Sequence, residues 1–470
     1  MRNKDTWPER WELTTLDDVT ERITNGINLP QLDLEIEKSF PISRIETIAN
    51  ESIDFNRVKY VVIDEDVLKK YSLQEGDILF SHINSDKHLG KTAIYNGERI
   101  LIHGVNLLLI RANSKIDKKL FNYLFRHYRF QGKFIDVAQR SVNQSSINQK
   151  KLKEFTVPLI SAEEQQRIVA KLDALFGHFD VLREKLDRIP VLLKNFRQQV
   201  LTQAVTGELT REWREGGGLP KQKAKEIRNK DYSLDDIPNE WVHTIIGTIA
   251  SVKGGKRLPK EEALTEEITN HPYIRARDLK KGTVLTENLL YITEDVYEKI
   301  SRYIVNEGDV YITIVGAKIG DAGIIPESMD GANLTENAAK LTEMQYVIPT
   351  YLSIWLRSPI CQAFIQKTIM SAAQGKLALT RIKSLPIYLP HLVEQEKIVS
   401  TVESLFSLAD KIESQYQSLK AKIDQLPQAT LAKAFLGELV EQEVKEYVRE
   451  AGEVLMTAGE MNCKIEKFDK

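Results

Sequence analysis

Apolar residues alternate at spacings of four and three along the stretch 162–206. They are Ile168, Leu172, Leu175, Phe179, Leu182, Leu186, Ile189, Leu193, Phe196 and Val200. This is the a/d pattern of a helix that packs along another helix. Such a helix would run about 65 Å at 1.5 Å per residue, which is too long for one compact domain. Charged residues lie between the apolar positions from 183 to 188, so we predict a narrow packing seam rather than a buried bundle helix.

The same element recurs 230 positions later, where Ile398, Val402, Leu405, Ala409, Ile412, Tyr416, Leu419, Ile423 and Leu426 keep the register. The flanking residues repeat as well. Glu164-Gln165 matches Glu394-Gln395, and Gly207-Glu208-Leu209 matches Gly437-Glu438-Leu439. A repeat at a fixed interval indicates a duplicated architecture. We predict two spacer helices that pack antiparallel on each other, in a chain with pseudo-twofold symmetry.

A globular segment precedes each helix. In the first, short β-like runs at 60–63, 77–80 and 107–110 alternate with helical stretches such as 118–130, which predicts a mixed α/β domain. The second segment repeats landmarks of the first and otherwise differs almost completely. We place the domains at 1–160 and 237–391, the spacer helices at 161–207 and 392–437, a polar linker at 208–236 and an acidic tail at 438–470. Pro190 is expected to kink the first helix.

Net charge, cysteine content and the absence of long apolar runs restrict the partners and the compartment that we expect for this protein. The 470 residues carry a formal charge of −2, so any contact with nucleic acid must come from local patches. Cys361 and Cys463 form no paired motif, which indicates a reducing compartment and no structural zinc. The N-terminus lacks a signal-peptide core, and no apolar run reaches the ~20 residues that span a bilayer. We expect a soluble, cytoplasmic protein without membrane association.

Catalytic signatures are missing from the sequence. Gly90-Lys91-Thr92 resembles the end of a phosphate-binding loop, but Ser85 stands where the first glycine is needed. There is no GxGxxG motif, no histidine pair with metal-ligand spacing, and no Asn-Pro-Pro-aromatic or Asp-Pro-Pro-aromatic tetrapeptide. We therefore predict that the chain is not itself an enzyme and binds neither metal nor cofactor.

Polar loops with scattered basic residues are the candidate DNA contacts. Asn and Gln can bond adenine, Arg and Lys can bond guanine, and Lys and Ser hold phosphates. Loop residues of this kind are usually only solvated, so the loops count as groups. In the first domain the candidates are Arg44, Ser81, His82, Asn84, Ser85, Lys87, His88, Lys91, Arg140, Asn143, Gln144 and Ser145. In the second they are Lys253, Lys256, Arg257, Arg275, Arg277, Thr313, Lys318, Gln374 and Lys376.

The duplicated order of motifs is similar to that of a known family. The Trp-containing starts (7–11 and 238–241), the Gly-Asp strands (76–77 and 308–309), the polar loops with Gln144 or Gln374, and the matching helix ends resemble the specificity subunit of Type I restriction-modification systems. The segment 189–214 further resembles the Type IA branch. The resemblance covers nearly the whole chain, and only the tail after Gly437 departs from the family pattern.

The resemblance implies that each globular domain is a target recognition domain reading one half of a split, asymmetric site in double-stranded DNA. It implies that the helices set the gap between the halves and dock two methyltransferase subunits, which methylate adenine at N6. Restriction subunits with motor and nuclease activity would join the complex. S-adenosylmethionine, ATP and Mg²⁺ would then bind to the partner subunits and not to this chain.

Two other classes of protein remain as alternatives. A fused restriction-methylation enzyme would need a cofactor loop and a catalytic tetrapeptide, and the sequence holds neither. A coiled-coil adaptor that binds only proteins would have little use for two related but divergent domains. Purified complexes would separate the three classes, because only a specificity subunit needs partners to act and still prefers one DNA sequence.

Overall fold

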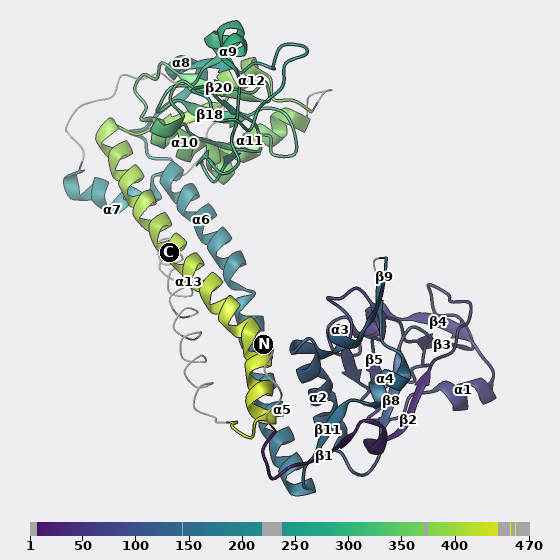
Figure 1. The fold of residues 1–470 in the computed structure, drawn as a ribbon. Helices are drawn as coiled ribbons and strands as arrows, with labels where there is room; N and C mark the ends of the chain where they lie inside the picture. The colour runs from purple at the N-terminus through teal and green to yellow at the C-terminus, as the bar shows by residue number, and fades with distance from the viewer. Residues whose placement is uncertain are drawn as a thin grey trace. The chain divides into compact units, whose positions relative to one another are not determined.

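The computed structural model describes residues 7–142, 144–218, 237–370 and 375–439, together with Gly452 and Met456. We call residues 7–160 head 1 and residues 237–391 head 2. The chain divides into two compact units: the first comprises 1–186 with 417–453, and the second 187–416 with 454–470. Each unit therefore contains one head and a part of each spacer element (Figure 1).

Head 1 is a mixed α/β domain, as expected, with strands at the predicted runs near 60, 78 and 108. Its elements are β1 (Glu12–Thr15), η1 (Asp17–Val19), β2 (Thr20–Asn25), β3 (Ser39–Ile42), η2 (Glu46–Ile48), η3 (Phe55–Arg57), β4 (Lys59–Val62), α1 (Glu65–Tyr71), β5 (Ile78–Phe80), β6 (Ile83–Asn84), β7 (Thr92–Ile94), β8 (Leu108–Ala112), α2 (Lys118–Phe130), α3 (Lys133–Val137), β9 (Gln139–Ser141), β10 (Gln144–Ser146), α4 (Gln149–Lys153) and β11 (Thr156–Leu159). The central sheet has the order β2-β8-β5-β7 and is antiparallel throughout.

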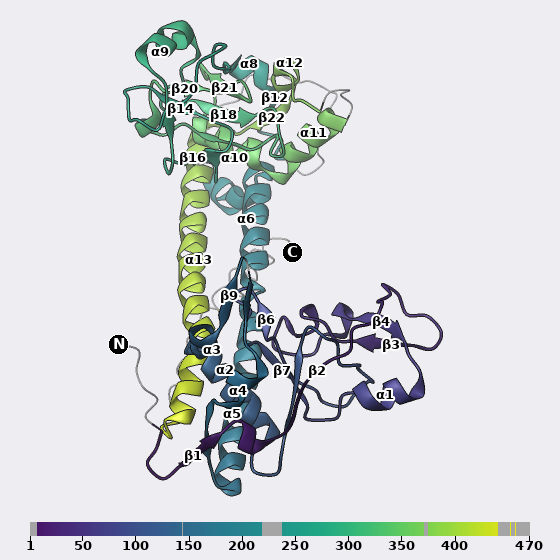
Figure 2. The same ribbon diagram turned by 45° about the vertical axis from the view of Figure 1, so that its right-hand side comes forward.

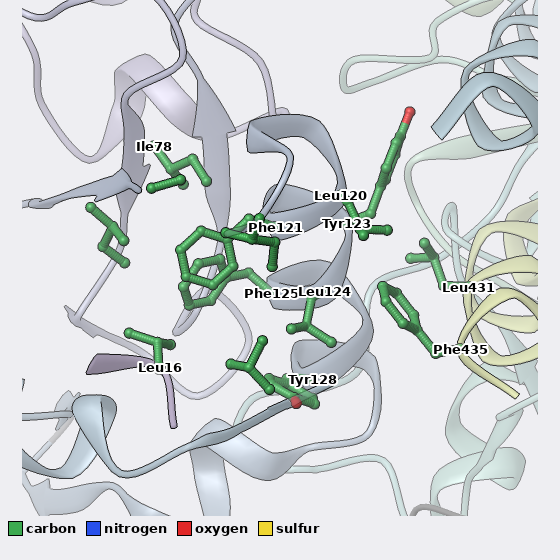
Figure 3. Close-up of a cluster of buried hydrophobic side chains, with 14 of the residues drawn as sticks. Leu16, Ile78, Leu120, Phe121, Tyr123, Leu124, Phe125, Tyr128, Leu431 and Phe435 are labelled. Carbon is green, nitrogen blue, oxygen red and sulfur yellow. The ribbon is translucent and has the colours of Figure 1, made fainter. Parts of the chain in front are cut away.

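Helix α2 links the sheet of head 1 to the spacer helices. The Asp117 side chain caps its first turn by accepting from the backbone N–H groups of Lys119 and Leu120, at 2.8 and 3.0 Å. One face of α2 packs on β7 and β8, and another packs on the spacer helix α5 (Ala162–Leu186). Figure 3 shows Phe121 and Phe125 directed toward the sheet side, and Leu431 and Phe435 of the last helix approaching from the other side. These residues belong to one buried cluster.

Head 2 repeats this plan with different residues. Its elements are β12 (Val242–Ile245), α8 (Ile246–Ile249), β13 (Ser251–Gly254), β14 (Pro272–Ile274), β15 (Leu279–Lys280), β16 (Thr283–Val284), β17 (Leu290–Tyr291), α9 (Glu294–Ile300), η6 (Ser301–Tyr303), β18 (Val310–Thr313), β19 (Ala322–Ile324), η7 (Glu327–Met329), β20 (Asn333–Leu334), β21 (Ala338–Thr342), α10 (Pro349–Arg357), α11 (Pro359–Met370), α12 (Leu379–Lys383) and β22 (Pro386–Leu389). The sheet β13-β21-β18-β19 corresponds strand for strand to that of head 1. Helix α10 packs on this sheet and on the spacer, as α2 does in head 1.

The first spacer is interrupted, which corrects the prediction of one kinked helix. Helix α5 (Ala162–Leu186) and helix α6 (Ile189–Thr206) are separated by two residues, and Pro190 lies in the first turn of α6. Proline is well tolerated there, because the first N–H groups of a helix have no intrahelical partner. The second spacer, α13 (Leu392–Phe435), is continuous and contains Pro427.

The spacer helices pair antiparallel within each unit. In the first unit, Arg183 of α5 lies 3.8 Å from Asp424 of α13, while the start of α5 and the end of α13 both adjoin Arg10. In the second unit, Arg197 of α6 contacts Asp410 and Glu413 at 2.6 and 2.9 Å. The predicted seam residues are buried except for Leu405 and Leu426, which are half-buried.

The predicted linker begins later than expected. Residues 208–218 fold into η4 (Glu208–Thr210), α7 (Arg211–Trp213) and the π-helical turn η5 (Arg214–Gly218). Arg214 fixes this segment to the end of α6 and the start of α13, because it donates to the Gly207 carbonyl and to the carboxylate of Glu394. The remainder of the linker, and the tail apart from Glu438, Leu439, Gly452 and Met456, lies outside the described residues. Every helix that the structure describes is too short or too polar to span a bilayer.

Candidate nucleic-acid interface

The two polar loops of head 1, which are far apart in the sequence, meet in one small sheet. Strand β6 pairs with β10, with Asn84 opposite Ser145, and β10 pairs with β9. The backbone N–H of Ile147 also donates to the carbonyl of His82 at 2.9 Å. The β9–β10 hairpin projects from the rest of head 1 (Figures 1 and 2). Both predicted loops therefore form a single surface.

Asp86 ties the hairpin to the preceding loop. The Ser145 hydroxyl donates to one carboxylate oxygen of Asp86, and the Arg140 guanidinium lies 3.6 Å from the other. Asp86 was not among the candidates, although it is the one acidic residue between Ser81 and Lys91. An acid in a loop otherwise rich in donors was the signal that could have identified it.

The candidates of head 1 divide into exposed and supporting residues. Ser85, Lys87, Arg140 and Gln144 are exposed, while Asn84 and His88 are half-buried. The buried candidates are Ser81, His82 and Ser145. Because a buried side chain cannot reach a base without rearrangement, these three are better suited to hold the loop backbones than to contact DNA.

Several candidates are already engaged by neighbouring groups. The Ser81 hydroxyl accepts from the Asn84 amide at 3.2 Å. The Lys91 ammonium donates to the Ala49 carbonyl, and burial lowers its pKa. Arg44 lies 3.3 Å from Glu46 in the turn after β3. Asn143 lies outside the described residues.

The histidines of this surface favour the neutral form. Burial lowers the pKa of His82. The pKa of His88 is also lowered, first by burial and then by the charges of Lys91 and Lys87. The positive potential of the loop at neutral pH therefore depends on the lysines and Arg140.

Head 2 joins its two candidate segments by the same backbone contact. The N–H of Leu377 donates to the carbonyl of Ile314 at 3.0 Å, at the end of β18. Thr313 is buried at this strand end, whereas Lys318 and Lys376 are exposed. Gln374 lies outside the described residues. The equivalent strand end thus carries the candidate surface in both heads.

Three cations of head 2 are paired, so its exposed charge is lower than the sequence suggests. Lys253 contacts Glu343 at 2.6 Å, and Arg257 contacts Glu336 at 2.7 Å. Arg275 forms a two-pronged pair with Asp278 at 2.8 and 2.9 Å. The others remain exposed: the Lys256 ammonium lies 5.6 Å from the centre of the Tyr303 ring, and Arg277 is on the surface.

A cavity of about 250 Å³ brings the candidate Lys253 together with two basic residues that the sequence did not single out. These are Arg302 and Lys340, which line the cavity with Lys253 and Tyr303. Lys253 and Lys340 are cross-strand neighbours, and Lys340 lies 3.2 Å from Asp309 of the repeated Gly-Asp motif. Two like charges directly opposite each other destabilise a strand pair. The motif aspartate offsets one of these charges and so has a structural role.

The repeated Glu-Gln motif attaches each head to its spacer helix. The Gln165 amide donates to the carbonyls of Lys115 and Ile160, and its oxygen accepts from the Asp117 N–H. Gln395 makes the corresponding three contacts with Tyr346, Pro390 and Ile348. This geometry explains why a glutamine occupies the same place in both repeats.

The Gly-Glu-Leu motif supplies a second attachment in each unit. Gly207 has a positive φ of 81° and packs so closely on Pro238 and Trp241 of head 2 that no side chain would fit. Gly437, with a φ of 73°, lies against Pro8 and Arg10 of head 1. Each head is therefore contacted by the end of one spacer helix and the start of another. Helix α6 ends and α13 starts at head 2, and α13 ends and α5 starts at head 1.

Among the described residues, no three His, Cys, Asp or Glu side chains gather where they could hold a metal ion.

Comparison with known proteins identifies the repeated unit. The family model for the Type I restriction modification DNA specificity domain matches residues 8–191 and again residues 238–421. The chain is 30% identical over 430 residues to the assigned specificity subunit of the type I restriction enzyme MjaX from Methanocaldococcus jannaschii, covering 88% of this chain and 92% of that protein. It is 32% identical over 334 residues to the EcoBI specificity subunit from Escherichia coli, covering 70% of this chain and 67% of the relative.

Solved structures share the fold. A chain from a study of complex assembly and conformational transition of the type I R-M system aligns with a TM-score of 0.66 at 17% identity, covering 93% of this chain and all of the other. The HsdS subunit from Thermoanaerobacter tengcongensis aligns with a TM-score of 0.54 at 17% identity, covering 92% and 98%. The mixed α/β heads, the paired helices and the internal repeat are thus confirmed, and the chain belongs to the family of Type I restriction-modification specificity subunits, with the specificity domain present twice.

Proposed function

We propose that this chain selects the DNA sequence on which a Type I complex acts, with each head reading one half of a bipartite, asymmetric target in double-stranded DNA. The observation that carries the proposal is the backbone contact shared by the heads. Ile147 to His82 in head 1 and Leu377 to Ile314 in head 2 join two polar segments at the same end of the same sheet. Divergent side chains on an equivalent framework suit two readers of different sequences.

The exposed groups of head 1 match the chemistry of base reading. The major groove, about 12 Å wide, admits a two-stranded β-ribbon. Gln144 can bond adenine and Arg140 can bond guanine from such a ribbon, and the exposed Lys87 can contact phosphate. In head 2, Lys318 and Lys376 adjoin the equivalent strand end.

The paired helices set the unread gap and dock two methyltransferase subunits in this proposal. Those subunits bind S-adenosylmethionine and methylate adenine at N6, and restriction subunits with ATP and Mg²⁺ complete the complex. This chain contributes sequence choice and geometry and makes no bonds itself. The names of its relatives, which are specificity subunits, support this division of labour.

Adenine-methylation mapping tests the proposal. Genomic DNA from cells expressing the chain with its methyltransferase partner should carry N6-methyladenine in both halves of one split motif. Cells expressing either protein alone are the control and should carry none. A stable complex that leaves no methylated motif would contradict the proposal and favour a protein-only adaptor. Methylation by the chain without a partner would instead indicate an enzyme.

A further inference from the structure

Val142 stands at the end of the β9–β10 hairpin and is 90% exposed, more than any other large apolar side chain in the described part of the chain. Ser141 pairs with Gln144, so only positions 142 and 143 lie between the strands. The neighbouring Gln139, Arg140, Ser141 and Gln144 are all polar and exposed. Val142 is therefore an isolated apolar group at the end of a polar ribbon.

Turn chemistry disfavours valine at this position. Two-residue hairpin loops favour Asn, Asp and Gly, whereas β-branched residues suit strands. Single exposed apolar residues are common on protein surfaces, so exposure alone would mean little. Here the side chain gains no packing, because it is almost fully exposed, and it occupies a turn, where glycine and small polar residues are the usual choice. The fold gives no reason for a valine at this position, which leaves contact with a ligand as the reason.

The hairpin is held firmly enough to present this side chain. Strand β10 pairs on one side with β9 and on the other with β6. Asp86 anchors the hairpin through Ser145 and Arg140. A preorganised element loses less entropy on binding than a mobile loop does. The end of the hairpin therefore presents two methyl groups in a defined position beside groups suited to base edges.

We propose that Val142 contacts the 5-methyl group of a thymine in the major groove, and so specifies one position of the half-site read by head 1. This inference rests on the proposed function of head 1. The thymine methyl is the apolar group that a base edge offers in the major groove, and it is the chemical match for an aliphatic side chain on a polar ribbon. Burying one methyl against Val142 contributes roughly a fourfold gain in affinity.

Uracil substitution isolates this contact, because uracil differs from thymine only by the methyl group. The target is first taken from the methylation map. Each thymine in both half-sites is then replaced by uracil, one at a time, in duplexes bound by the complex of this chain with its methyltransferase partner. At one position in one half-site, uracil should weaken binding by roughly fourfold to tenfold.

The Val142→Ala variant should bind the thymine and uracil duplexes equally at that position. Val142→Thr keeps the size and one methyl and should retain part of the preference. Val62→Ala is the matched control, since Val62 is 57% exposed on β4 outside the hairpin. It should keep the full preference for thymine.

Three results would overturn the inference. In the first, uracil weakens binding equally in the wild type and in Val142→Ala. In the second, no thymine position responds to uracil. In the third, Val142→Ala weakens binding to all duplexes alike. The last result would indicate an apolar wedge between base pairs, which carries no methyl preference. A methylated split motif with any of these results removes only the Val142 assignment, whereas a missing motif removes the proposed function and this inference with it.

Discussion

The indole N–H of Trp241 donates a hydrogen bond to the carboxylate of Glu394 at 3.1 Å. Thr210 donates to the other carboxylate oxygen at 2.8 Å, and the Arg214 guanidinium binds the same oxygen. Trp241 opens head 2, Glu394 lies in the first turn of α13, and Thr210 and Arg214 follow α6. One carboxylate thus joins three segments of the second unit.

Removing this carboxylate should destabilise the second unit strongly. Glu394 has no exposed surface, so Glu394→Ala leaves the Arg214 charge and two further donors without their acceptor. The expected loss is about 3–5 kcal/mol, as for other broken buried pairs. Urea unfolding of the full chain, with limited proteolysis to report on each unit, would measure it.

Glu164 provides the matched control in the first unit. It pairs with Arg10 at 2.8 Å, but this pair is partly exposed. Glu164→Ala should therefore cost less than about 1 kcal/mol. Equal losses for the two variants would show that Glu394 is not the stronger attachment.

Acid should weaken the first unit through buried histidines. Burial lowers the pKa of both His103 and His127 from 6.5 to about 4. The unfolded chain then takes up protons at higher pH than the folded chain. Stability is lost as pH falls below about 6.5 and levels off below about 4, with a loss of up to about 2 kcal/mol per histidine at pH 5.

The His127→Phe variant tests the source of this acid sensitivity. His127 lies against Phe435 at the end of α13, with ring centroids 5.1 Å apart, so an apolar ring should be accommodated there. The variant should lose less stability between pH 7 and pH 5 than the wild type in urea unfolding. An unchanged difference between the two pH values would mean that His127 does not contribute.

Asp86→Ala should change specific and non-specific DNA binding in opposite directions. Losing a negative charge beside the hairpin should strengthen non-specific binding at low salt. Losing the anchor for Ser145 and Arg140 should weaken binding to the target. Fluorescence anisotropy with target and scrambled duplexes over a range of salt concentrations would measure both effects.

Glu35→Ala makes the same charge change in an exposed loop outside the hairpin. It should leave the preference for the target intact. If it reduced this preference as much as Asp86→Ala does, charge alone would explain the effect and the anchoring role would be refuted.

Gln144→Ala should weaken binding to the target by roughly 1–3 kcal/mol if the side chain bonds a base edge. The effect should be confined to the target, because a base contact adds little to non-specific affinity. Gln31→Ala, at an exposed position away from the hairpin, should have no effect. An unchanged affinity of Gln144→Ala for the target would exclude the contact. The same reasoning applies to Gln374.

Deleting one heptad from a single spacer helix should change the tolerated gap or abolish activity. The half-site sequences should stay the same, since the heads keep their side chains. Methylation mapping of the variant would show the outcome. Altered bases within a half-site would refute the idea that the helices act as a spacer.

The paired helices could be predicted because their signal is local. A seam at alternating four and three positions reports the period of a packed helix, and the repeat of Ile168 at Ile398 reports the duplication. The break before Ile189 could not be read in this way. Pro190 is compatible with a kink inside a helix or with the first turn of a new one, and the choice depends on how the surrounding chain packs.

The candidate surface depended on contacts between distant residues. The sequence identified the loops around Ser81 and Gln144 by their polar residues, but only the pairing of β6 with β10 joins them. It could not show that Ser81, Ser145 and Thr313 are buried, or that Lys253 is paired with Glu343. Such pairings join residues tens of positions apart, and periodicity and composition carry no information about them.

What the sequence determined by itself was the duplicated plan, the helical spacers, the α/β heads and the family, because repeats, periods and motifs are read along one dimension. The tertiary structure decided which polar residues face solvent, which charges are offset, and how Glu394 connects Trp241, Thr210 and Arg214. Burial and ion pairing are properties of residues brought together by folding, and their partners are set by the packing of the whole unit.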